Sequence, residues 1–281
     1  MLANLKDVLV PAEKEKYCVG HFNVVTLEMA RGVIEAAEEA GAPVILGIEE
    51  KHLSVCPPEI FASFVIPMAR KASVPVVVHF DRGQTFHRCI EALKLGFTSV
   101  NLDCSRDTLE NNEAKVAEMA RCAHAFGATV EAELGYTPSA AEVEEGLSAD
   151  YFTDPKQTAE YVAKTEADAL AISVGTAHGE YKVHPELDYS RIRAITEAVD
   201  LPLVLHGGSG LSDSAIREAI SSGISKIDIF TDINIACCQG AIQAVNDGVH
   251  LQSEVSPYQV HAVKVVAAEK IKLFQNRELR S

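Results

Sequence analysis

Short apolar runs rich in β-branched residues recur along the chain about every 30 residues. Each run has the length of a buried strand and is followed by a longer amphipathic stretch. The predicted strands are Val19–Val24, Pro43–Ile48, Pro75–Phe80, Ser99–Cys104, Thr129–Leu134, Ala169–Ser173, Pro202–Leu205 and Lys226–Phe230. Strands that alternate with helices in this way form a parallel sheet, because each connection is long enough to hold a crossover helix.

The stretches between the strands have apolar residues at helical spacing. The clearest helix is predicted at 27–40, where Met29, Val33 and Ala37 repeat with a helical period and Gly41 marks the end. Further helices are predicted at 58–72, 110–126, 155–165, 189–199, 213–222, 233–246 and 257–274.

Eight strand–helix units predict an α/β fold of the (β/α)8 TIM-barrel type, with residues 1–281 forming a single domain. A doubly wound open sheet is the rival architecture. It ranks lower, because no GxGxxG motif follows the first strand and the chain has no two separable halves.

Composition excludes several classes of partner. The chain has 25 Lys and Arg against 40 Asp and Glu, a formal charge of −15, which disfavours nucleic acids and anionic membrane surfaces. Its apolar runs are too short to span a bilayer, and its amino terminus lacks the apolar core of a signal peptide. Seven cysteines without a CxxC pair favour reduced thiols and a cytoplasmic location.

Polar side chains lie at the carboxyl end of every predicted strand, the end at which barrel enzymes place their chemistry. They are His21, Asn23, Glu49, Asp81, Arg82, Asp103, Ser105, Glu131, Glu133, Thr176, His178, His206, Asp228 and Thr231. A single residue of this kind is often only a helix cap, but a set that spans all eight strands predicts an active site.

The sharpest local signal is the segment His206-Gly207-Gly208-Ser209-Gly210, which lies between a strand and a helix. Glycines allow backbone N–H groups to approach an anion closely, and the next helix adds its positive end. Thr231, after the last strand, brings a hydroxyl to the same region. The pattern predicts a phosphate site, although the glycines could also serve only a tight turn.

Two histidines end neighbouring strands. His178 lies in Gly175-Thr176-Ala177-His178-Gly179, and His206 begins the glycine-rich segment. Neutral imidazoles at adjacent strand ends could ligate one divalent cation, so both are candidate metal ligands. No lysine lies on the carboxyl part of a predicted strand, and Lys226 begins its strand, which argues against an imine-forming enzyme.

A collinear series of motifs covers nearly the whole chain. Its main members are His21-Phe22-Asn23-Val24, Val78-His79-Phe80-Asp81-Arg82-Gly83, Val130-Glu131-Ala132-Glu133-Leu134-Gly135, Gly175 to Tyr181, Pro202 to Gly210, and Glu269 to Phe274. With these motifs the chain resembles the class II, zinc-dependent ketose-bisphosphate aldolases, the fructose- and tagatose-bisphosphate aldolase group.

This resemblance implies cleavage of a ketose phosphate into dihydroxyacetone phosphate and an aldehyde, with zinc polarising the ketone. In the family three histidines hold the zinc, and an Asp just before the first moves the proton of the cleaving hydroxyl. Asp81 matches that acid, and His178 and His206 match the second and third zinc ligands. The predicted catalytic residues are Asp81, Arg82 and Glu133, the last matching the acidic residue of the Glu-Leu-Gly motif. The predicted substrate-binding residues are Asn23, Glu49, Gly179, Gly207, Gly208, Ser209, Asp228 and Thr231.

The departures from the family pattern cluster at the barrel mouth. Arg82 replaces the first zinc-ligand histidine, and a guanidinium has no free lone pair for a metal. Asp228 replaces an Asn that contacts the triose, and Glu49 replaces a small polar residue. Because their strands are neighbours, we expect an ion pair between Glu49 and Arg82.

We therefore expect an aldolase with altered metal or substrate handling. In one version His178, His206 and a carboxylate such as Glu133 hold Zn²⁺ or another divalent cation. In the other version Arg82 is the fixed positive charge. The alternatives are a non-catalytic sugar-phosphate-binding protein and an isomerase or epimerase on the same barrel. The expected ligand is a small sugar phosphate, and the resemblance implies a homodimer or homotetramer.

Overall fold

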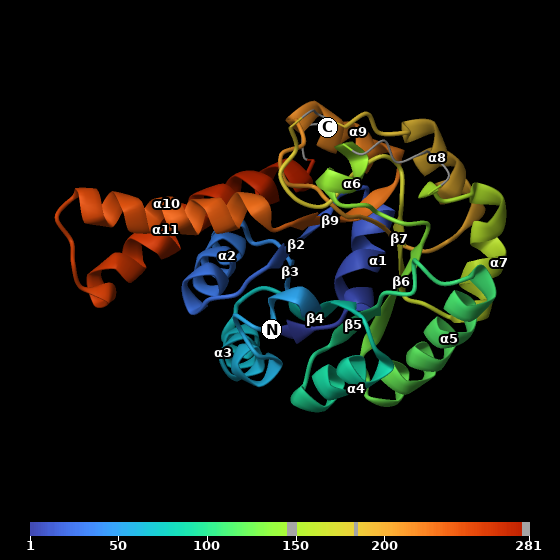
Figure 1. The fold of residues 1–281 in the computed structure, drawn as a ribbon, viewed down its shortest axis with the longest axis horizontal. Coiled ribbons are helices and arrows are strands. Elements are labelled where there is room, and N and C mark those ends of the chain that lie inside the picture. The colour runs from blue at the N-terminus through green and yellow to red at the C-terminus, as the bar shows by residue number, and fades with distance from the viewer. Residues whose placement is uncertain (145–150, 183–184, 277–281) are drawn as a thin grey trace.

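A computed structural model of the chain describes residues 1–144, 151–182 and 185–276. Within these residues, eight parallel strands close into a (β/α)8 TIM barrel, which confirms the predicted fold (Figure 1). The barrel strands are β2 (Val19–Asn23), β3 (Val44–Glu49), β4 (Val76–Gly83), β5 (Ser99–Leu102), β6 (Thr129–Leu134), β7 (Ala169–Ile172), β8 (Leu203–Leu205) and β9 (Ile224–Ile229). Each pairs in parallel with the next, and β9 pairs with β2 to close the ring.

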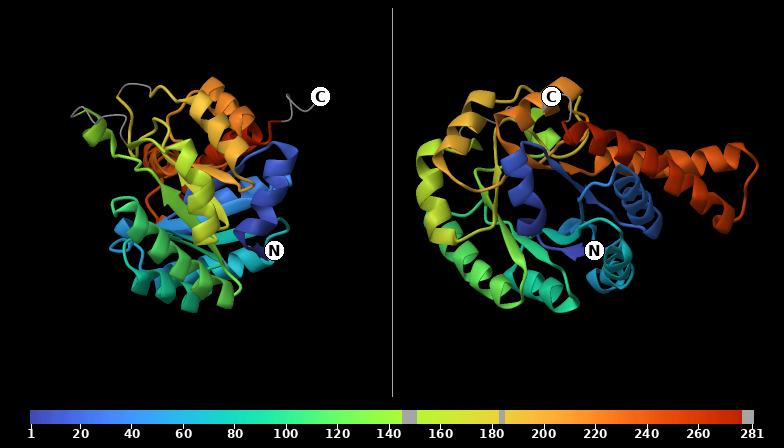
Figure 2. Two further views of the ribbon diagram at one scale, coloured as in Figure 1. Left: turned by 90° about the vertical axis from the view of Figure 1, so that its right-hand side faces the viewer. Right: turned by 180° about the vertical axis from the view of Figure 1, so that it is seen from behind.

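Helices form a layer around the barrel, as the view from behind also shows (Figure 2). They are α1 (Leu5–Glu15), α2 (Leu27–Ala40), the 3-10 turn η1 (Glu50–His52), α3 (Pro58–Lys71), α4 (Phe86–Leu95), α5 (Leu109–Ala125), α6 (Ala140–Glu144), α7 (Pro155–Thr165), α8 (Tyr189–Ala198), α9 (Asp213–Ser222), α10 (Thr231–Asn246) and α11 (Gln252–Phe274). Several helices begin at polar caps: the Thr26 side chain accepts the Met29 N–H, and the Ser212 side chain accepts the Ala215 N–H.

Most predicted elements have the expected position. The bounds of α2, α7, α9 and β6 agree with the prediction residue for residue. The short strand β1 (Leu2–Ala3) and the helices α1, α4 and α6 were not predicted. Strand β4 runs past Phe80 to Gly83, with an irregular register against β5 that reshapes the backbone around Arg82.

Helix α1 covers the amino-terminal end of the barrel. Its buried residues Leu5, Val8, Leu9 and Ala12 pack on inward-facing residues at that end of the strands. Those strand residues are Val19, Ile45, Val77, Ala169, Ala171 and Val204. This small apolar cluster closes one end of the barrel, and the polar interior lies toward the other end.

Helices α10 and α11 form a hairpin, called the arm below, that projects from the barrel beside α2 (Figure 1). The segment 233–246 of α10 contains no charged residue, and Ile235, Ile242 and Val245 are 43–57% exposed. Among the described residues, no helix is both long and apolar enough to cross a membrane.

Candidate active site

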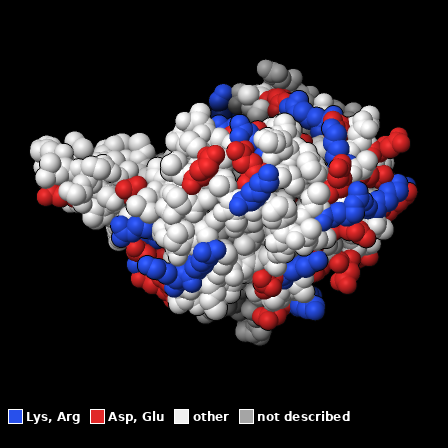
Figure 3. Space-filling model, turned by 90° about the horizontal axis from the view of Figure 1, so that it is seen from below, with Lys and Arg blue, Asp and Glu red and all other residues white. Residues whose placement is uncertain are grey.

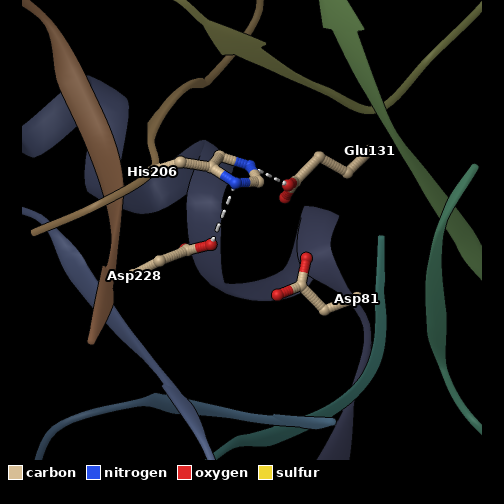
Figure 4. A group of neighbouring side chains, drawn as sticks. All are labelled: Asp81, Glu131, His206 and Asp228. Atoms are coloured by element: carbon tan, nitrogen blue, oxygen red, sulfur yellow. Dashed lines mark hydrogen bonds and ion pairs between the residues drawn. The ribbon is translucent and has the colours of Figure 1, made fainter. Parts of the chain in front are cut away.

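Four buried polar side chains converge inside the barrel near the carboxyl ends of the strands (Figure 4). Asp81 comes from β4, Glu131 from β6, His206 follows β8 and Asp228 lies on β9. One ligand atom from each lies within 4.8 Å of those of the other three. We call these four residues the acid–imidazole cluster. Parallel strands bring them together because alternate residues of each strand face the barrel interior.

His206 is the centre of the acid–imidazole cluster. Its Nε2 lies 3.2 Å from Glu131 Oε1, and its Nδ1 lies 3.7 Å from Asp228 Oδ2. Burial lowers the pKa of His206, but the carboxylates of Asp228 and Glu131 outweigh that effect and raise the pKa to about 10. Without a metal, this imidazole is therefore protonated on both nitrogens and positively charged at neutral pH.

Lys226 supplies a second buried cation next to the cluster. Its Nζ lies 2.7 Å from Asp228 Oδ1 and 2.9 Å from Glu131 Oε2, and its side chain is fully buried. His21 Nδ1 lies 2.9 Å from the same Asp228 oxygen. Burial raises the pKa of Asp228, but the adjacent His21 imidazole and Lys226 ammonium lower it by more, so that the pKa lies well below its usual value.

Asp81 is held in place from one side only. Its Oδ2 accepts a 2.7 Å hydrogen bond from Asn23 Nδ2, whereas its buried Oδ1 has no hydrogen-bond partner. Burial raises the pKa of Asp81, but the neighbouring imidazoles of His21 and His206 lower it by more. The net pKa is below the usual value, so the group is ionised at neutral pH. A fixed carboxylate with a free oxygen is suited to accept a proton.

Arg82, near the carboxyl end of β4, contacts two neighbouring side chains with its guanidinium. Its Nη2 donates to Asp103 Oδ2 at 2.9 Å, and its Nη1 makes a short contact with His178 Nε2. The backbone of Arg82 has a φ of 49°, a left-handed conformation that is costly for a residue with a side chain. Burial and the Arg82 charge lower the pKa of His178 well below its usual value, so the imidazole is neutral and its Nε2 accepts a hydrogen bond from the guanidinium.

Glu133, two residues after Glu131 on β6, has both carboxylate oxygens buried and without a hydrogen-bond partner. Burial raises its pKa to about 7, despite the opposing effect of the Arg82 charge. Such a carboxyl exchanges its proton near neutral pH, a property typical of acid–base residues in enzymes.

The cluster opens onto a cavity of about 160 Å³, called the inner cavity below. Its walls are Asn23, Glu49, Lys51, Asp81, His178, Gly179, Gly207, Ser209, Asp228, Phe230 and Thr231. These include every predicted substrate-binding residue except Gly208. The Gly208 N–H instead donates to the Asp228 carbonyl at 2.9 Å, which fixes the glycine-rich loop to β9.

Backbone geometry shows why the loop contains glycines. Gly207 has a φ of 71°, and a Cβ there would overlap the Ala177 carbonyl oxygen. The Tyr181 hydroxyl donates to the Gly207 carbonyl at 2.7 Å, and Ser209 Oγ accepts the Phe230 N–H at 3.1 Å. The loop is thereby joined to the start of α10, so the amino end of this helix lies beside the inner cavity.

Two inferences from the sequence are wrong. The expected Glu49–Arg82 ion pair is absent, because Arg82 pairs with Asp103 and Glu49 pairs with Lys51 at 2.6 Å. The sequence also predicts that Lys226 begins its strand, far from the site, whereas it is the third residue of β9 and its ammonium reaches the cluster. The signal was available: Lys226 is two residues before Asp228, and Glu131 is two before Glu133, so each pair shares the inner face of its strand.

The family's three-histidine zinc site does not fit this chain. Arg82 replaces one ligand and occupies the Nε2 lone pair of the second, His178. The acid–imidazole cluster could nevertheless bind a divalent cation, because its buried Asp81 Oδ1, His206 Nδ1 and Asp228 Oδ2 have no hydrogen-bond partner. Carboxylate oxygens and imidazole nitrogen are ordinary metal ligands.

A closed parallel barrel with a carboxylate, an imidazole and a glycine-rich anion loop at its mouth is the arrangement of a class II aldolase. The sequence matches the family described as fructose-bisphosphate aldolase class-II over residues 3–278. The chain therefore belongs to the class II fructose-bisphosphate aldolase family, whose members use a divalent metal.

The similarity to known proteins covers nearly the full chain. A protein of Escherichia coli K12 named uncharacterized protein YdjI is 40% identical over 279 residues, which cover 98% of each chain. A Staphylococcus aureus Mu50 protein named fructose-bisphosphate aldolase is 35% identical, with 97% of each chain covered. The crystal structure of the YdjI aldolase covers 100% of both chains at a TM-score of 0.86 and 37% identity. A structure from Coccidioides immitis, at 23% identity and a TM-score of 0.84, covers 97% of this chain and shares the fold.

Proposed function

We propose that this protein is a lyase that cleaves a phosphorylated ketose into dihydroxyacetone phosphate and an aldehyde, at a cation site altered by Arg82. The observation that carries the proposal is the convergence of Asp81, His206 and Asp228 beside the glycine-rich loop. This convergence brings an ionised acid and a set of metal-ligand atoms to one edge of the inner cavity.

The triose phosphate end of the substrate would bind at the glycine-rich loop. Backbone N–H groups of Gly207 and Ser209, the Thr231 hydroxyl and the amino end of α10 favour a phosphate there. Asn23 and Gly179 also line the inner cavity and would contact the carbon chain. This placement orients the bond to be cleaved toward Asp81.

Asp81 would take the proton from the hydroxyl of the carbon that becomes the aldehyde. Its ionised state and its unpartnered Oδ1 suit that role, and Asn23 keeps the carboxylate from rotating. Glu133, with a pKa raised by burial to about 7, is the second candidate for proton exchange, behind Arg82.

The residues that would hold the cation are Glu131, His206 and Asp228, which leave Asp81 free for the proton. When bound, a divalent cation supplies Lewis-acid polarisation of the ketone. A set of two carboxylates and one imidazole suits Mn²⁺ or Mg²⁺ as well as Zn²⁺, unlike a site of three imidazoles. Lys226 neutralises one of the three carboxylates of the acid–imidazole cluster, so that a divalent cation would balance the charge of the other two.

The direct test is cleavage by the purified protein after chelation and metal restoration. Release of dihydroxyacetone phosphate from fructose and tagatose phosphates is followed with a coupled dehydrogenase, without metal and with Zn²⁺, Mn²⁺ or Mg²⁺. We expect cleavage that depends on added metal, and a loss of about 10²- to 10⁴-fold in kcat for Asp81→Asn. Asp107→Asn is the matched control, because Asp107 is a surface residue paired with Lys115.

Other results would select the alternatives. Cleavage that survives complete chelation would assign the positive charge to Arg82 instead of a metal. Tight binding of ketose phosphates without turnover would indicate a sugar-phosphate-binding protein. Isomerisation or epimerisation without carbon–carbon cleavage would indicate a different enzyme on this barrel.

We further propose that the protein assembles with itself through the arm and acts in the cytoplasm. The long uncharged segment of α10 and the exposed Ile242 and Val245 support a protein interface, and the arm is mostly free of charged side chains in Figure 3. All seven cysteines are free thiols, which suits a reducing compartment.

A further inference from the structure

A second cavity, called the outer cavity below, adjoins the inner cavity at the barrel mouth. Its volume is about 340 Å³, and it shares Glu49, Lys51 and His178 with the inner cavity. The outer cavity lies on the side away from the glycine-rich loop, which lines only the inner cavity. A substrate whose phosphate binds at the loop would therefore extend its other end into the outer cavity.

Every cation in the wall of the outer cavity has a carboxylate partner in the same wall. The pairs are Lys51 with Glu49 at 2.6 Å, Arg82 with Asp103 at 2.9 Å, and Arg106 with Glu142 at 2.8 Å. Three positive charges thus meet three negative charges, and the formal charge of the six residues is zero.

The remaining wall consists of neutral polar groups. Gln84, Thr137 and Ser139 contribute amide and hydroxyl groups, and Tyr136 contributes its ring and hydroxyl. The Arg106 guanidinium stacks 4.3 Å from the centre of the Tyr136 ring, so this cation is held from two sides. The wall offers both donors and acceptors, and each of its described cations already has a carboxylate partner.

This pattern distinguishes between two kinds of substrate. A second phosphate would need donors that are free of carboxylates, because a dianion placed beside Glu49, Asp103 and Glu142 is repelled unless a cation is released. A chain of hydroxyl groups both donates and accepts, so it can bond to the partners of an ion pair without separating them.

We propose that the outer cavity binds an uncharged polyhydroxylated fragment, so that the preferred substrate is a ketose carrying one phosphate rather than a ketose bisphosphate. This inference rests on the proposed function for the direction in which the substrate lies. It adds the chemical class of the aldehyde product, which would be a sugar aldehyde without phosphate.

The test compares matched substrates that differ only in the second phosphate. Fructose 1-phosphate and tagatose 1-phosphate are compared with their 1,6-bisphosphates in kcat/KM, and binding of all four is measured by calorimetry on the metal-loaded protein. We expect the monophosphates to be favoured by about tenfold or more, the factor that one unfavourable charge contact of moderate strength would produce.

The binding measurement keeps the inference separate from the proposed function. If no compound is cleaved, the proposed function fails, but tighter binding of the monophosphates would still support the inference. Equal or tighter binding of the bisphosphates would overturn the inference, whether or not cleavage occurs. Failure of all four to bind would overturn it as well.

A charge variant tests the cause. Glu142→Gln leaves the Arg106 guanidinium without its carboxylate, so we expect the bisphosphate to gain at least about threefold in kcat/KM relative to the monophosphate. Glu91→Gln frees Arg88 from an ion pair of 2.6 Å on α4 and serves as the matched control, with the ratio unchanged. An unchanged ratio in a folded Glu142→Gln protein would contradict the proposed role of the ion pairs.

Discussion

The ammonium of Lys226 lies 2.7 Å from a carboxylate oxygen of Asp228, two residues further along the same strand. Both side chains point into the barrel, and Lys226 also contacts Glu131 on the far side of the ring. A lysine inside a barrel is tolerated only when its charge is matched, and here it joins two carboxylates that would otherwise repel each other. The pair therefore links the stability of the barrel to the charge of its active site.

Removing the Lys226 charge should destabilise the fold. In Lys226→Met the apolar volume is kept, but Glu131 and Asp228 lose their common counter-charge, and we expect a loss of about 3–5 kcal/mol in the free energy of unfolding. Urea denaturation followed by circular dichroism measures it. Lys115→Met is the control, because Lys115 forms an exposed ion pair with Asp107 and should change stability little.

Glu133 should make stability depend on pH. Burial raises its folded pKa to about 7 from 4.5, so its contribution to stability is fully present below pH 4.5 and is lost as the pH rises through 7. The loss is about 3 kcal/mol, since one pKa unit corresponds to about 1.4 kcal/mol. Glu133→Gln removes this titration, so the variant should be more stable than the wild type at pH 8 and nearly equal at pH 5. If the difference in unfolding free energy between the variant and the wild type is the same at pH 5 and pH 8, the raised pKa of Glu133 is contradicted.

Restoring a histidine at position 82 should restore a stronger metal site. Arg82→His adds a ligand and frees the Nε2 lone pair of His178, so we expect Zn²⁺ affinity to rise by at least about tenfold. Competition with a chromogenic chelator measures the affinity without turnover. Arg88→His on the surface of α4 controls for adventitious binding by a new imidazole. No gain over that control would mean that the surrounding pocket has changed beyond the loss of one ligand.

The glycine-rich loop should not tolerate a side chain at Gly207. Gly207→Ala combines a φ of 71° with overlap on the Ala177 carbonyl, so we expect a loss of stability of about 1–3 kcal/mol and weaker binding of dihydroxyacetone phosphate. Gly248→Ala has a similar φ of 84° but open space around the new Cβ. The difference between the two variants isolates the steric effect, and it should be seen both in thermal unfolding and in calorimetric affinity.

The arm should determine the assembly state. Ile242 on α10 is 55% exposed, and Ile242→Glu places a charge in the uncharged stretch, so we expect dissociation into smaller species by light scattering. Ile60→Glu on α3 is the control, because Ile60 is 56% exposed on the barrel itself. A wild-type protein that is monomeric at micromolar concentration would refute self-assembly through the arm.

Much of the fold could be predicted from local patterns. The strand runs and the helix at 27–40 are strongly periodic, and Thr26 and Gly41 mark its ends, so the barrel followed from counting units. Helix α4 is absent from the prediction although its signals are present in the sequence, since Thr85 and Gly96 bound an amphipathic stretch at Phe86–Leu95. Helix α1 was missed because it precedes the first barrel strand and packs at the barrel end, which no strand–helix alternation reveals.

The sequence predicted which residues form the site better than it predicted which of them contact one another. The strand ends identified Asp81, His206 and Asp228, because residue type and position along a strand suffice for that purpose. The partners could not be predicted, since Arg82 could reach either Glu49 or Asp103, and only the irregular β4 backbone selects Asp103. Long side chains such as Arg82 and Lys226 extend far from their Cα atoms, so their contacts depend on three-dimensional packing.

Because α1 and its apolar contacts close the amino-terminal end of the barrel, solvent and ions have restricted access to the interior. In the described part of the chain, this closure leaves the inner cavity as the route by which solvent reaches Asp81 and Asp228. A sugar phosphate resident in that opening would stand between the buried carboxylates and the bulk water. Any ion held beneath it would be trapped until the sugar departs, so chelators should extract it slowly from the occupied protein and quickly from the empty one.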